Sequence, residues 1–341
     1  MKVLSCIAPE KLEYQTMAMP SPAEGHTILK IKSVGVCGTD LHSFRGTQPY
    51  FSYPRVLGHE LSGIIVETDR SDFQKDELVT ILPYFNCGIC VACRMGKPNC
   101  CASLQVAGIH VDGGMAEYFS VPSNCLVHAQ GLDEEALALV EPFAIGAHAI
   151  KRAGIQPNDF VLISGAGPIG LTLTAFAKMA GAHVIVLDIN HDRLRFCTEQ
   201  LQLAHALDAK DENLFDQIRM ITSGNMPQVV IDATGNQKAI NGLFQYMSHG
   251  GKYILVGLQK ENICFSHPEF HKREATLMSS RNATREDFDQ VIQVMRQKSI
   301  NPDIYITHRI PFEKAKNDFG SLLDPANRVI KAMIRMDERE S

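Results

Sequence analysis

The chain has 341 residues, a formal net charge of −5, 45% hydrophobic residues and 21% charged residues. Its length predicts two domains, and a negative charge without any basic run argues against a nucleic-acid partner. Because it has no signal-peptide pattern and no apolar run of about 18 residues, we expect a cytoplasmic protein with no membrane partner. Ten cysteines in a reducing compartment indicate metal ligation rather than disulfide bonds.

Short strands separated by loops are predicted for residues 1–145. The strand candidates are 28–36, 61–67 and 78–82, and turn residues lie between them. The first part of the chain should therefore form a β-rich domain.

A four-cysteine loop follows the last of these strands, with the spacing C-x2-C-x2-C-x7-C. Thiolates are soft ligands, and zinc binds four of them tetrahedrally at about 2.3 Å. Four protein ligands leave no open position, so a structural zinc site is predicted. Four unrelated buried cysteines are the alternative, and Cys100 competes with Cys101 for the last place. The spacing favours Cys87, Cys90, Cys93 and Cys101.

A second, mixed set of ligand types is spread more widely along the chain. Cys37 follows the predicted strand 28–36, His59 and Glu60 come later, and Glu141 lies much further on. Each alone is typical of an ordinary core or hydrogen-bonded residue. Together they supply the sulfur, nitrogen and oxygen ligands of a catalytic zinc, which keeps one position free.

Strands and helices alternate in the next part of the chain. An apolar strand at 160–164 leads through a glycine turn into a helix at 169–180, and a second strand follows at 184–188. Further strands are expected at 229–232 and 253–256. This alternation predicts an α/β domain with a parallel sheet that has helices on both faces.

The glycine turn has the sequence G-x-G-x-x-G between strand and helix, as a dinucleotide site requires. Asp188 ends the next strand, where a carboxylate binds ribose hydroxyls and disfavours a 2′-phosphate, so NAD is expected over NADP. Arg193 complicates this prediction because arginine can bind a 2′-phosphate. The predicted cofactor-binding residues here are Gly165, Gly167, Pro168, Ile169, Gly170, Asp188 and Arg193.

Together these motifs resemble the zinc-containing medium-chain alcohol dehydrogenases over essentially the whole chain, and residues 113–118 look like that family's signature strand. The resemblance implies a GroES-like catalytic domain at 1–145, completed by about 285–341. It also implies a doubly wound Rossmann NAD-binding domain at 146–284. Relatives of this kind are dimers or tetramers, so a homo-oligomer is expected.

The Val-Glu-Pro context of Glu141 resembles the polyol and threonine dehydrogenase branch. In that branch Cys37 and His59 would hold the catalytic zinc. Glu60 and Glu141 would be ligands or near-ligands, and the sequence leaves open which of them binds directly. About two zinc ions per chain are therefore expected.

The same resemblance implies a proton relay in which the Thr39 hydroxyl takes the substrate proton and His42 delivers it to solvent. It also places a strand end under the nicotinamide, formed by Leu255, Val256 and Gly257.

Residues 51–58, 108–114 and 279–284 look like bacterial hexonate dehydrogenases. That resemblance implies oxidation at C5 of L-gulonate (to D-fructuronate) or L-galactonate (to D-tagaturonate). A sugar-acid carboxylate calls for a cation or other donor, and the candidates are Arg281 and His110, with Arg55 and Lys272 behind them. Sorbitol, another polyol or threonine is the alternative substrate. A nucleotide-sensing protein without catalysis is the alternative class.

Overall fold

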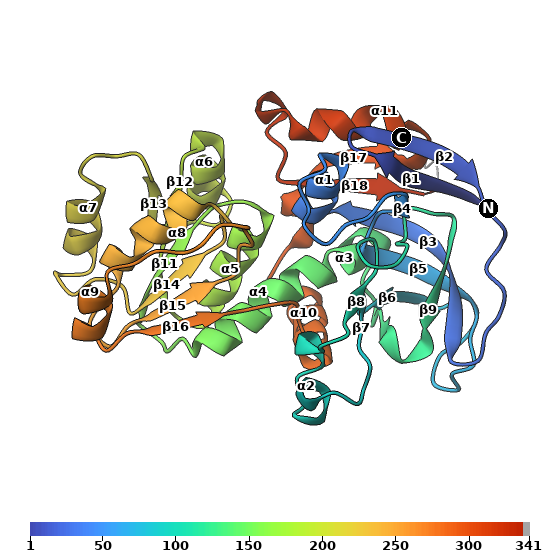
Figure 1. Ribbon diagram of the computed structural model, residues 1–341, viewed down its shortest axis with the longest axis horizontal. Helices are drawn as coiled ribbons and strands as arrows, with labels where there is room; N and C mark the ends of the chain where they lie inside the picture. The colour runs from blue at the N-terminus through green and yellow to red at the C-terminus, as the bar shows by residue number, and fades with distance from the viewer. Residues whose placement is uncertain (337–341) are drawn as a thin grey trace. The chain divides into compact units, whose positions relative to one another are not determined.

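A computed structural model describes residues 1–336, which form two compact units (Figure 1). Unit 1 combines Met1–Ala144 with the stretch that begins at Ala283, and unit 2 is Ile145–Asn282. The border falls within helix α4 (Val140–Ala153). Among residues 1–336, no helix is long and apolar enough to cross a membrane.

Unit 1 is built on a seven-stranded sheet within the described residues, and its central strand is β3. β5 pairs along one side of β3, while β9 and β18 pair with different halves of it, all antiparallel. A strand from near the end of the chain thus lies beside an early one. The strands are β3 (His26–Val36), β5 (Glu60–Glu67), β6 (Leu78–Ile81), β9 (Tyr118–Pro122), β10 (Leu126–His128), β17 (Ile306–Pro311) and β18 (Lys331–Arg335).

The remaining elements of unit 1 flank this sheet. A three-stranded sheet has the order β2-β1-β4, and a short ribbon of β7 and β8 encloses the cysteine loop. The strands are β1 (Lys2–Ala8), β2 (Lys11–Thr16), β4 (Arg55–Val56), β7 (Tyr84–Phe85) and β8 (Gln105–Val106). The helices are α1 (Gly38–Phe44), α2 (Val91–Arg94), α3 (Glu134–Ala138), α10 (Arg285–Arg296) and α11 (Phe312–Asp318).

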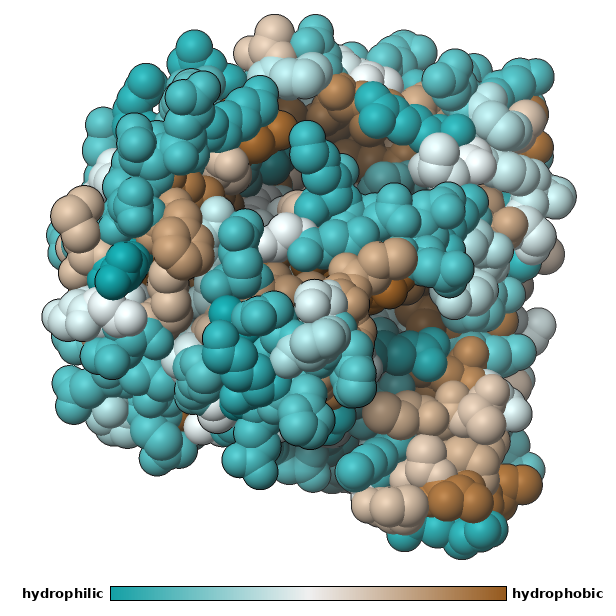
Figure 2. All heavy atoms as spheres, turned by 60° about the vertical axis from the view of Figure 1, so that its left-hand side comes forward, coloured by the Kyte–Doolittle hydropathy of each residue, from teal (hydrophilic) through white to brown (hydrophobic). Residues whose placement is uncertain are grey.

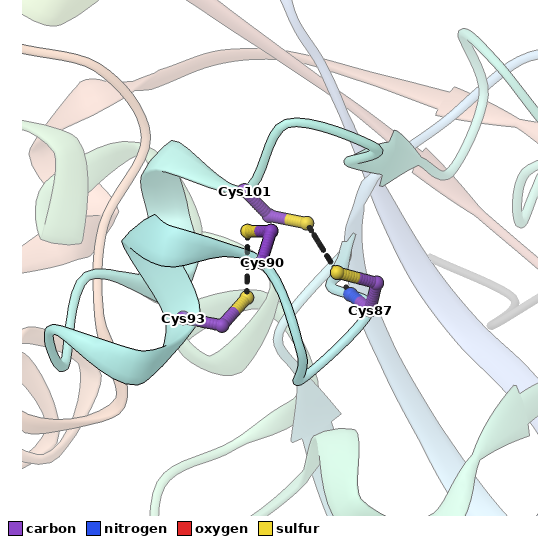
Figure 3. A group of neighbouring side chains, drawn as sticks. All are labelled: Cys87, Cys90, Cys93 and Cys101. Carbon is purple, nitrogen blue, oxygen red and sulfur yellow. Dashed lines mark hydrogen bonds between the residues drawn. The ribbon is translucent and has the colours of Figure 1, made fainter.

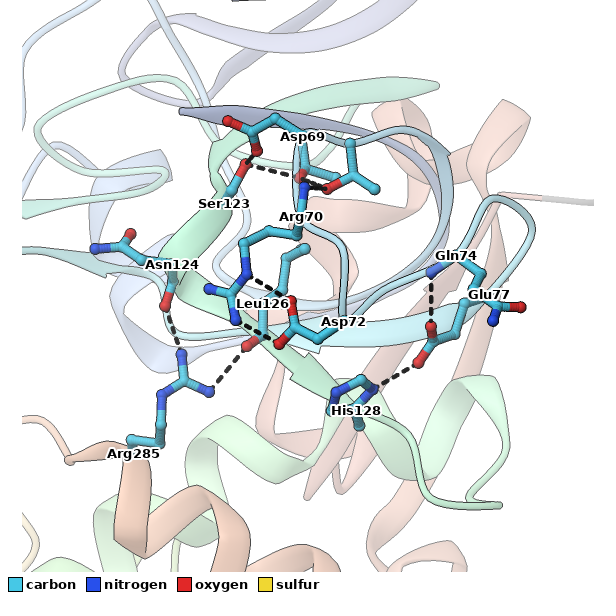
Figure 4. A network of polar contacts seen from close by, with 12 residues as sticks. Asp69, Arg70, Asp72, Gln74, Glu77, Ser123, Asn124, Leu126, His128 and Arg285 are labelled. Carbon is cyan, nitrogen blue, oxygen red and sulfur yellow. Dashed lines mark hydrogen bonds and ion pairs between the residues drawn. The ribbon is translucent and has the colours of Figure 1, made fainter. Parts of the chain in front are cut away.

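Polar contacts attach α10 to the earlier part of unit 1 (Figure 4). The Arg285 guanidinium donates to the carbonyl oxygens of Leu126 (2.9 Å) and Asn124 (2.5 Å). In the same region His128 Nδ1 lies 2.6 Å from Glu77 Oε1. The two Arg285 contacts fix the returning chain on β10 and on the turn before it.

Unit 2 is an α/β domain whose six strands, all within the described residues 145–282, run in parallel in the order β13-β12-β11-β14-β15-β16. This is the Rossmann order, and the strand order reverses between β11 and β14. The strands are β11 (Phe160–Ser164), β12 (His183–Asp188), β13 (His205–Asp208), β14 (Val229–Asp232), β15 (Lys252–Leu255) and β16 (Thr276–Ser279). The helices are α5 (Pro168–Met179), α6 (His191–Glu199), α7 (Leu214–Ile221), α8 (Gln237–Leu243) and α9 (His267–Lys272).

Each unit has its own apolar core. In unit 1 Leu29 and Ile31 of β3 and Leu61 of β5 are buried, and in unit 2 Leu162 and Val230 are fully buried. Hydrophilic residues cover most of the face in Figure 2, where apolar residues form separate smaller groups. The predicted fold class, a GroES-like domain with a Rossmann sheet, is confirmed.

One local expectation was wrong. Of residues 113–118 only Tyr118 belongs to a β-ladder strand, β9. Gly113 and Gly114 instead form a loop pressed against the chain, where a Cβ on Gly113 would collide with the Gly58 carbonyl oxygen. Close backbone approach, rather than strand pairing, explains the glycine pair.

Candidate functional site

The four cysteines of the loop converge in the structure (Figure 3). The sulfur atoms of Cys87, Cys90, Cys93 and Cys101 all lie within 4.8 Å of one another. Cys90 and Cys93 are 3.5 Å apart, and Cys87 and Cys101 are 3.4 Å apart. A tetrahedral zinc with bonds of about 2.3 Å needs sulfur separations of about 3.8 Å. The donor set and its spacing therefore fit zinc, and Cys100 is exposed and outside the group.

Backbone hydrogen bonds in this loop reach the sulfur atoms. The Cys87 N–H donates to Cys101 Sγ at 3.3 Å, and Gly88 turns the chain with φ of 74°. Hydrogen bonds from the backbone of Ala102 and Cys93 lower the pKa of Cys90 to about 6, whereas burial and the hydrogen bond with Cys90 raise the pKa of Cys93 to about 11. A lowered pKa favours the thiolate, which is the form that binds metal, so Cys90 is the thiol best prepared for a cation.

Cys37, His59 and Glu60 form a second convergent group, with ligand atoms within 4.8 Å of one another. Cys37 directly follows β3, and Glu60 is the first residue of β5. Because β3 and β5 are antiparallel with Gly35 opposite Glu60, the end of one strand meets the start of the other. A Cβ on Gly35 would collide with the Glu60 carboxylate, so only glycine leaves room for it.

Asp40, which the sequence analysis missed, joins the two ligand-bearing segments. It is buried, and its carboxylate accepts from the backbone N–H groups of Cys37 (2.9 Å) and Gly58 (3.1 Å). His59 Nδ1 lies 3.7 Å from the same carboxylate. Burial opposes a charge on His59, yet Asp40 and Cys37 outweigh it and raise the pKa of His59 well above its usual value. The group thus attracts positive charge, as a metal site must.

Glu60 has a buried cationic partner, Lys331 on β18, which the sequence analysis also missed. The Lys331 ammonium donates to both carboxylate oxygens, at 2.6 and 2.8 Å, and to the Val36 carbonyl at 3.1 Å. Burial acts to lower the pKa of Lys331, but the charges of Glu60 and Cys37 leave it raised. Lys331 therefore remains an ammonium and compensates the charge of Glu60.

Glu141 lies outside the three-ligand group of Cys37, His59 and Glu60. It is buried, and Oε1 accepts a hydrogen bond from the phenol of Tyr84. Burial and the nearby Glu60 raise the pKa of Glu141 to about 7, while His59 lowers it. The carboxylate is thus near enough to interact electrostatically with the group without belonging to it.

The predicted relay residues lie on α1, which begins after Cys37. Thr39 is half-buried and His42 is exposed, three residues further along the helix, so they share one face. His42 Nδ1 is 2.9 Å from Thr47 Oγ1. Burial and Arg45 lower the pKa of His42.

In unit 2 the glycine turn joins β11 to α5. Gly165 has φ of 100°, and a Cβ on Gly170 would collide with the Gly165 carbonyl oxygen. Gly167 precedes Pro168 and Ile169, the first residues of α5. The turn therefore needs small residues, and it leaves the helix N-terminus open to an anion.

Asp188, at the end of β12, is held next to this turn. Its carboxylate accepts from the backbone N–H groups of Ala166 (2.6 Å) and Asn190 (2.8 Å). Arg193 lies 3.8 Å from the same carboxylate, and a Cβ on Gly167 would be 3.7 Å from the Arg193 guanidinium. The arginine is therefore paired with a carboxylate beside the glycine turn.

β15 ends at Leu255, and the N–H groups of Val256 and Gly257 both donate to the Asp232 carbonyl at 3.0 Å. A Cβ on Gly257 would collide with the Gly235 nitrogen. The strand order reverses between β11 and β14, and a tight glycine turn follows each of these two strands. A dinucleotide crevice requires such turns at this point.

The candidate cations for a substrate carboxylate do not form one cluster within a unit. In unit 1 Arg55 already pairs with Asp112 at 3.4 Å, and His110 accepts the N–H of Val106 at Nδ1. In unit 2 Arg281 follows β16, and Lys272 is exposed at the end of α9. Because Arg55 is already paired with Asp112, it is a weaker candidate for binding a substrate carboxylate.

Comparison with known proteins gives the same result for both units. A family model described as an alcohol dehydrogenase GroES-like domain matches residues 23–131, and one described as a zinc-binding dehydrogenase matches 168–297. L-galactonate-5-dehydrogenase of Escherichia coli (strain K12) is 47% identical over 98% of each chain. A sorbitol dehydrogenase of Halalkalibacterium halodurans is 30% identical, covering 85% of this chain and 86% of that protein.

A similar solved structure is an alcohol dehydrogenase of Escherichia coli CFT073 complexed with the cofactor NADH. It superposes with a TM-score of 0.91 at 30% identity, covering 98% of this chain and 99% of that one. With the two convergent ligand groups and the Rossmann sheet, these matches confirm the resemblance stated from the motifs. The chain belongs to the zinc-binding medium-chain dehydrogenases and is a zinc-dependent alcohol dehydrogenase that acts on a CH–OH group.

Proposed function

We propose that this enzyme oxidises the C5 hydroxyl of a hexonate with NAD as the electron acceptor. L-galactonate, giving D-tagaturonate, is the favoured substrate, and L-gulonate, giving D-fructuronate, is the next. The observation that carries this proposal is the 47% identity to L-galactonate-5-dehydrogenase over 98% of both chains. The NADH in the related crystal structure and the position of Asp188 support NAD.

In this proposal residues 1–145, completed by 285–341, are the catalytic domain, and residues 146–284 bind NAD. Cys37 and His59 hold the catalytic zinc, with Glu60 and Glu141 as ligand or near-ligand, and the four-cysteine loop holds the structural zinc. Bound zinc acts as a Lewis acid that makes a nearby hydroxyl more acidic. The convergence of Cys37, His59 and Glu60 supports this assignment.

Within the same proposal the chain itself moves the released proton. The Thr39 hydroxyl can accept and donate at once, and His42 passes the proton to solvent. The exposure of His42 and its lowered pKa support this role, because a neutral imidazole can take up a proton at neutral pH. Arg281 and His110 are proposed to bind the substrate carboxylate.

A polyol substrate is the second candidate, because the chain is 30% identical to a sorbitol dehydrogenase. The purified enzyme should be assayed with L-galactonate, L-gulonate, sorbitol and threonine, each with NAD and with NADP, by the absorbance of the reduced cofactor. We expect the highest kcat/KM with L-galactonate and NAD. Turnover of sorbitol without turnover of either hexonate would refute the substrate proposal.

Cys37→Ala tests the proposed zinc ligand. We expect the variant to lose turnover while it still binds NADH and retains one zinc per chain in metal analysis. A variant that keeps two zinc ions and full activity would remove Cys37 from the site. As part of the same proposal we expect a cytoplasmic homo-oligomer of two or four chains, which light scattering on the purified protein can measure.

A further inference from the structure

Tyr84 contacts the proposed catalytic site, yet neither motif nor family model assigns it a role. Its side chain is 6% exposed, and its phenol donates a hydrogen bond to Oε1 of Glu141, which is 5% exposed. Burial, and after it the negative charges of Glu141, Cys37 and Glu60, raise the pKa of Tyr84 well above its usual value. The phenol therefore lies at the border of the three-ligand group.

The two glutamates of this region have partners of different charge. Glu60 is held by the ammonium of Lys331, whose positive charge compensates the carboxylate. Glu141 is held by a phenol, which is neutral. A neutral donor satisfies one oxygen of a buried carboxylate without adding a positive charge beside it. The phenol therefore orients Glu141 without forming the ion pair that Lys331 forms with Glu60.

The position of Tyr84 is fixed from several sides. Tyr84 pairs with Val106 in the β7–β8 ribbon, and the Ala107 N–H donates to the Pro83 carbonyl at 3.0 Å. The ring of Phe288 packs edge-on against the phenol ring, with centroids 6.4 Å apart. The four-cysteine loop connects β7 to β8. A metal in that loop would therefore clamp the ribbon that carries the phenol.

We propose that Tyr84 is a positioning residue: its phenol holds the Glu141 carboxylate in a fixed orientation at the catalytic metal site of Cys37, His59 and Glu60. The inference rests on the proposed assignment of that group as the catalytic zinc site. Tyr84 belongs to the β7–β8 ribbon that carries the four-cysteine loop, yet by this proposal it serves the other metal site, that of Cys37, His59 and Glu60. Removing the phenol oxygen should leave Glu141 free to reorient.

Tyr84→Phe removes one oxygen atom and keeps the ring that packs against Phe288. The full-length zinc-loaded variant and wild type are mixed with a chromophoric chelator, and the release of both zinc ions is followed over time. Losing an outer-shell partner usually lowers metal affinity about 10–100-fold, and we expect the catalytic zinc ion to leave the variant faster by a factor of that order. The other zinc ion should leave at the wild-type rate.

Tyr253→Phe is the matched control, because Tyr253 is fully buried in unit 2 and donates to the Ile240 carbonyl. It should release both zinc ions as wild type does. Cobalt placed in the catalytic site gives a second measurement, and its visible absorption should change in Tyr84→Phe and stay unchanged in Tyr253→Phe. Wild-type release and an unchanged cobalt spectrum in Tyr84→Phe would overturn the inference.

A double-mutant cycle separates positioning from general loosening of the fold. Glu141→Ala is measured alone and together with Tyr84→Phe. If Tyr84 acts through Glu141, removing the phenol should change zinc release less than about twofold once Glu141 is absent. An undiminished effect in that background would refute the mechanism. Failure of wild type to bind a second zinc would instead refute the proposed function itself.

Discussion

Three buried carboxylates surround Cys37 and His59, and each has a different kind of partner. Asp40 accepts backbone N–H groups, Glu60 accepts an ammonium, and Glu141 accepts a phenol. An ionised carboxylate away from water costs several kcal/mol unless it is paired or hydrogen-bonded. The site is therefore held together by its polar contacts, and removing any one partner should destabilise the folded protein.

Lys331→Met tests this at the residue scale. The substitution keeps most of the side-chain volume but leaves Glu60 as a buried charge without its cation. We expect the metal-loaded protein to lose about 3–5 kcal/mol of unfolding free energy, measured by urea denaturation. Lys30→Met is the control, because Lys30 is exposed on the neighbouring β3. Equal stability of the two variants would contradict this account.

Residues of the site differ in how far the sequence could reveal them. Cys37 and His59 were found because their motifs are local. Asp40 could have been found as well, since it lies three residues after Cys37, where a side chain reaches back to the helix start. Lys331 meets Glu60 across 271 residues, and Tyr84 meets Glu141 across 57. No local pattern encodes such pairings.

At the scale of elements, the four-cysteine loop has almost no core of its own. None of the four residues of α2 is buried, and Ile89, Val91 and Met95 are exposed. Apolar burial therefore cannot hold this loop, and its order should depend on the metal.

Trypsin can test this dependence, because the Arg94–Met95 bond lies inside the loop. We expect the zinc-loaded protein to resist cleavage after Arg94 and the chelator-treated protein to be cut there, as read by mass spectrometry. Adding zinc back before digestion should restore resistance. Cleavage at an equal rate with and without metal would show that the loop is ordered by other means.

The turn between β5 and β6 should contribute to acid sensitivity (Figure 4). Hydrogen bonds from Ser123 and the Gly25 N–H lower the pKa of Asp69. As the pH falls, the carboxylate of Asp69 therefore binds a proton in the unfolded chain before it does so in the folded chain. The ionised carboxylate stabilises the fold fully above about pH 3.9, and this stabilisation is lost as the pH falls through the lower pKa of the folded state.

Asp69→Asn removes this titration while its amide oxygen can still accept a hydrogen bond. Below about pH 4 the Tm of the variant should fall less steeply than that of wild type. Asp216→Asn, on the exposed side of α7, is the control. If the Tm curves of wild type and Asp69→Asn stay parallel, Asp69 has no part in acid unfolding.

The elements of unit 2 were easier to predict than those of unit 1. Strands 160–164 and 229–232 were placed with the bounds that β11 and β14 have, because buried parallel strands are continuous apolar runs. In unit 1, β1 was missed although Val3 to Cys6 are also buried in succession. A strand was wrongly expected at residues 113–118, because Gly113 and Gly114 allow close packing against neighbouring chain segments.

At the scale of the whole molecule, the two units differ in how the chain builds them. Unit 2 is one continuous segment with its own core, whereas unit 1 needs strands from both ends of the described chain. The pairing of β18 with β3 joins residues that share no local signal. Its prediction from sequence therefore rested on family resemblance.

A fragment of residues 145–282 should consequently fold by itself and bind NADH. We expect cooperative thermal unfolding by circular dichroism and a fluorescence change on adding NADH. Asp188→Asn should weaken that binding at least about tenfold, since hydrogen bonds to a charged group contribute about 1.5–3 kcal/mol. An unfolded fragment would show that unit 2 depends on the rest of the chain.

Lys331 is synthesised long after its partner Glu60, which determines when the site can form in the growing chain. Lys331 is added 271 residues after Glu60, which takes about 14–54 s at typical rates of protein synthesis. The thiols of 87–101, by contrast, emerge almost together. A nascent polypeptide can thus capture its structural ion early, while the reactive centre is assembled only after Lys331 has emerged.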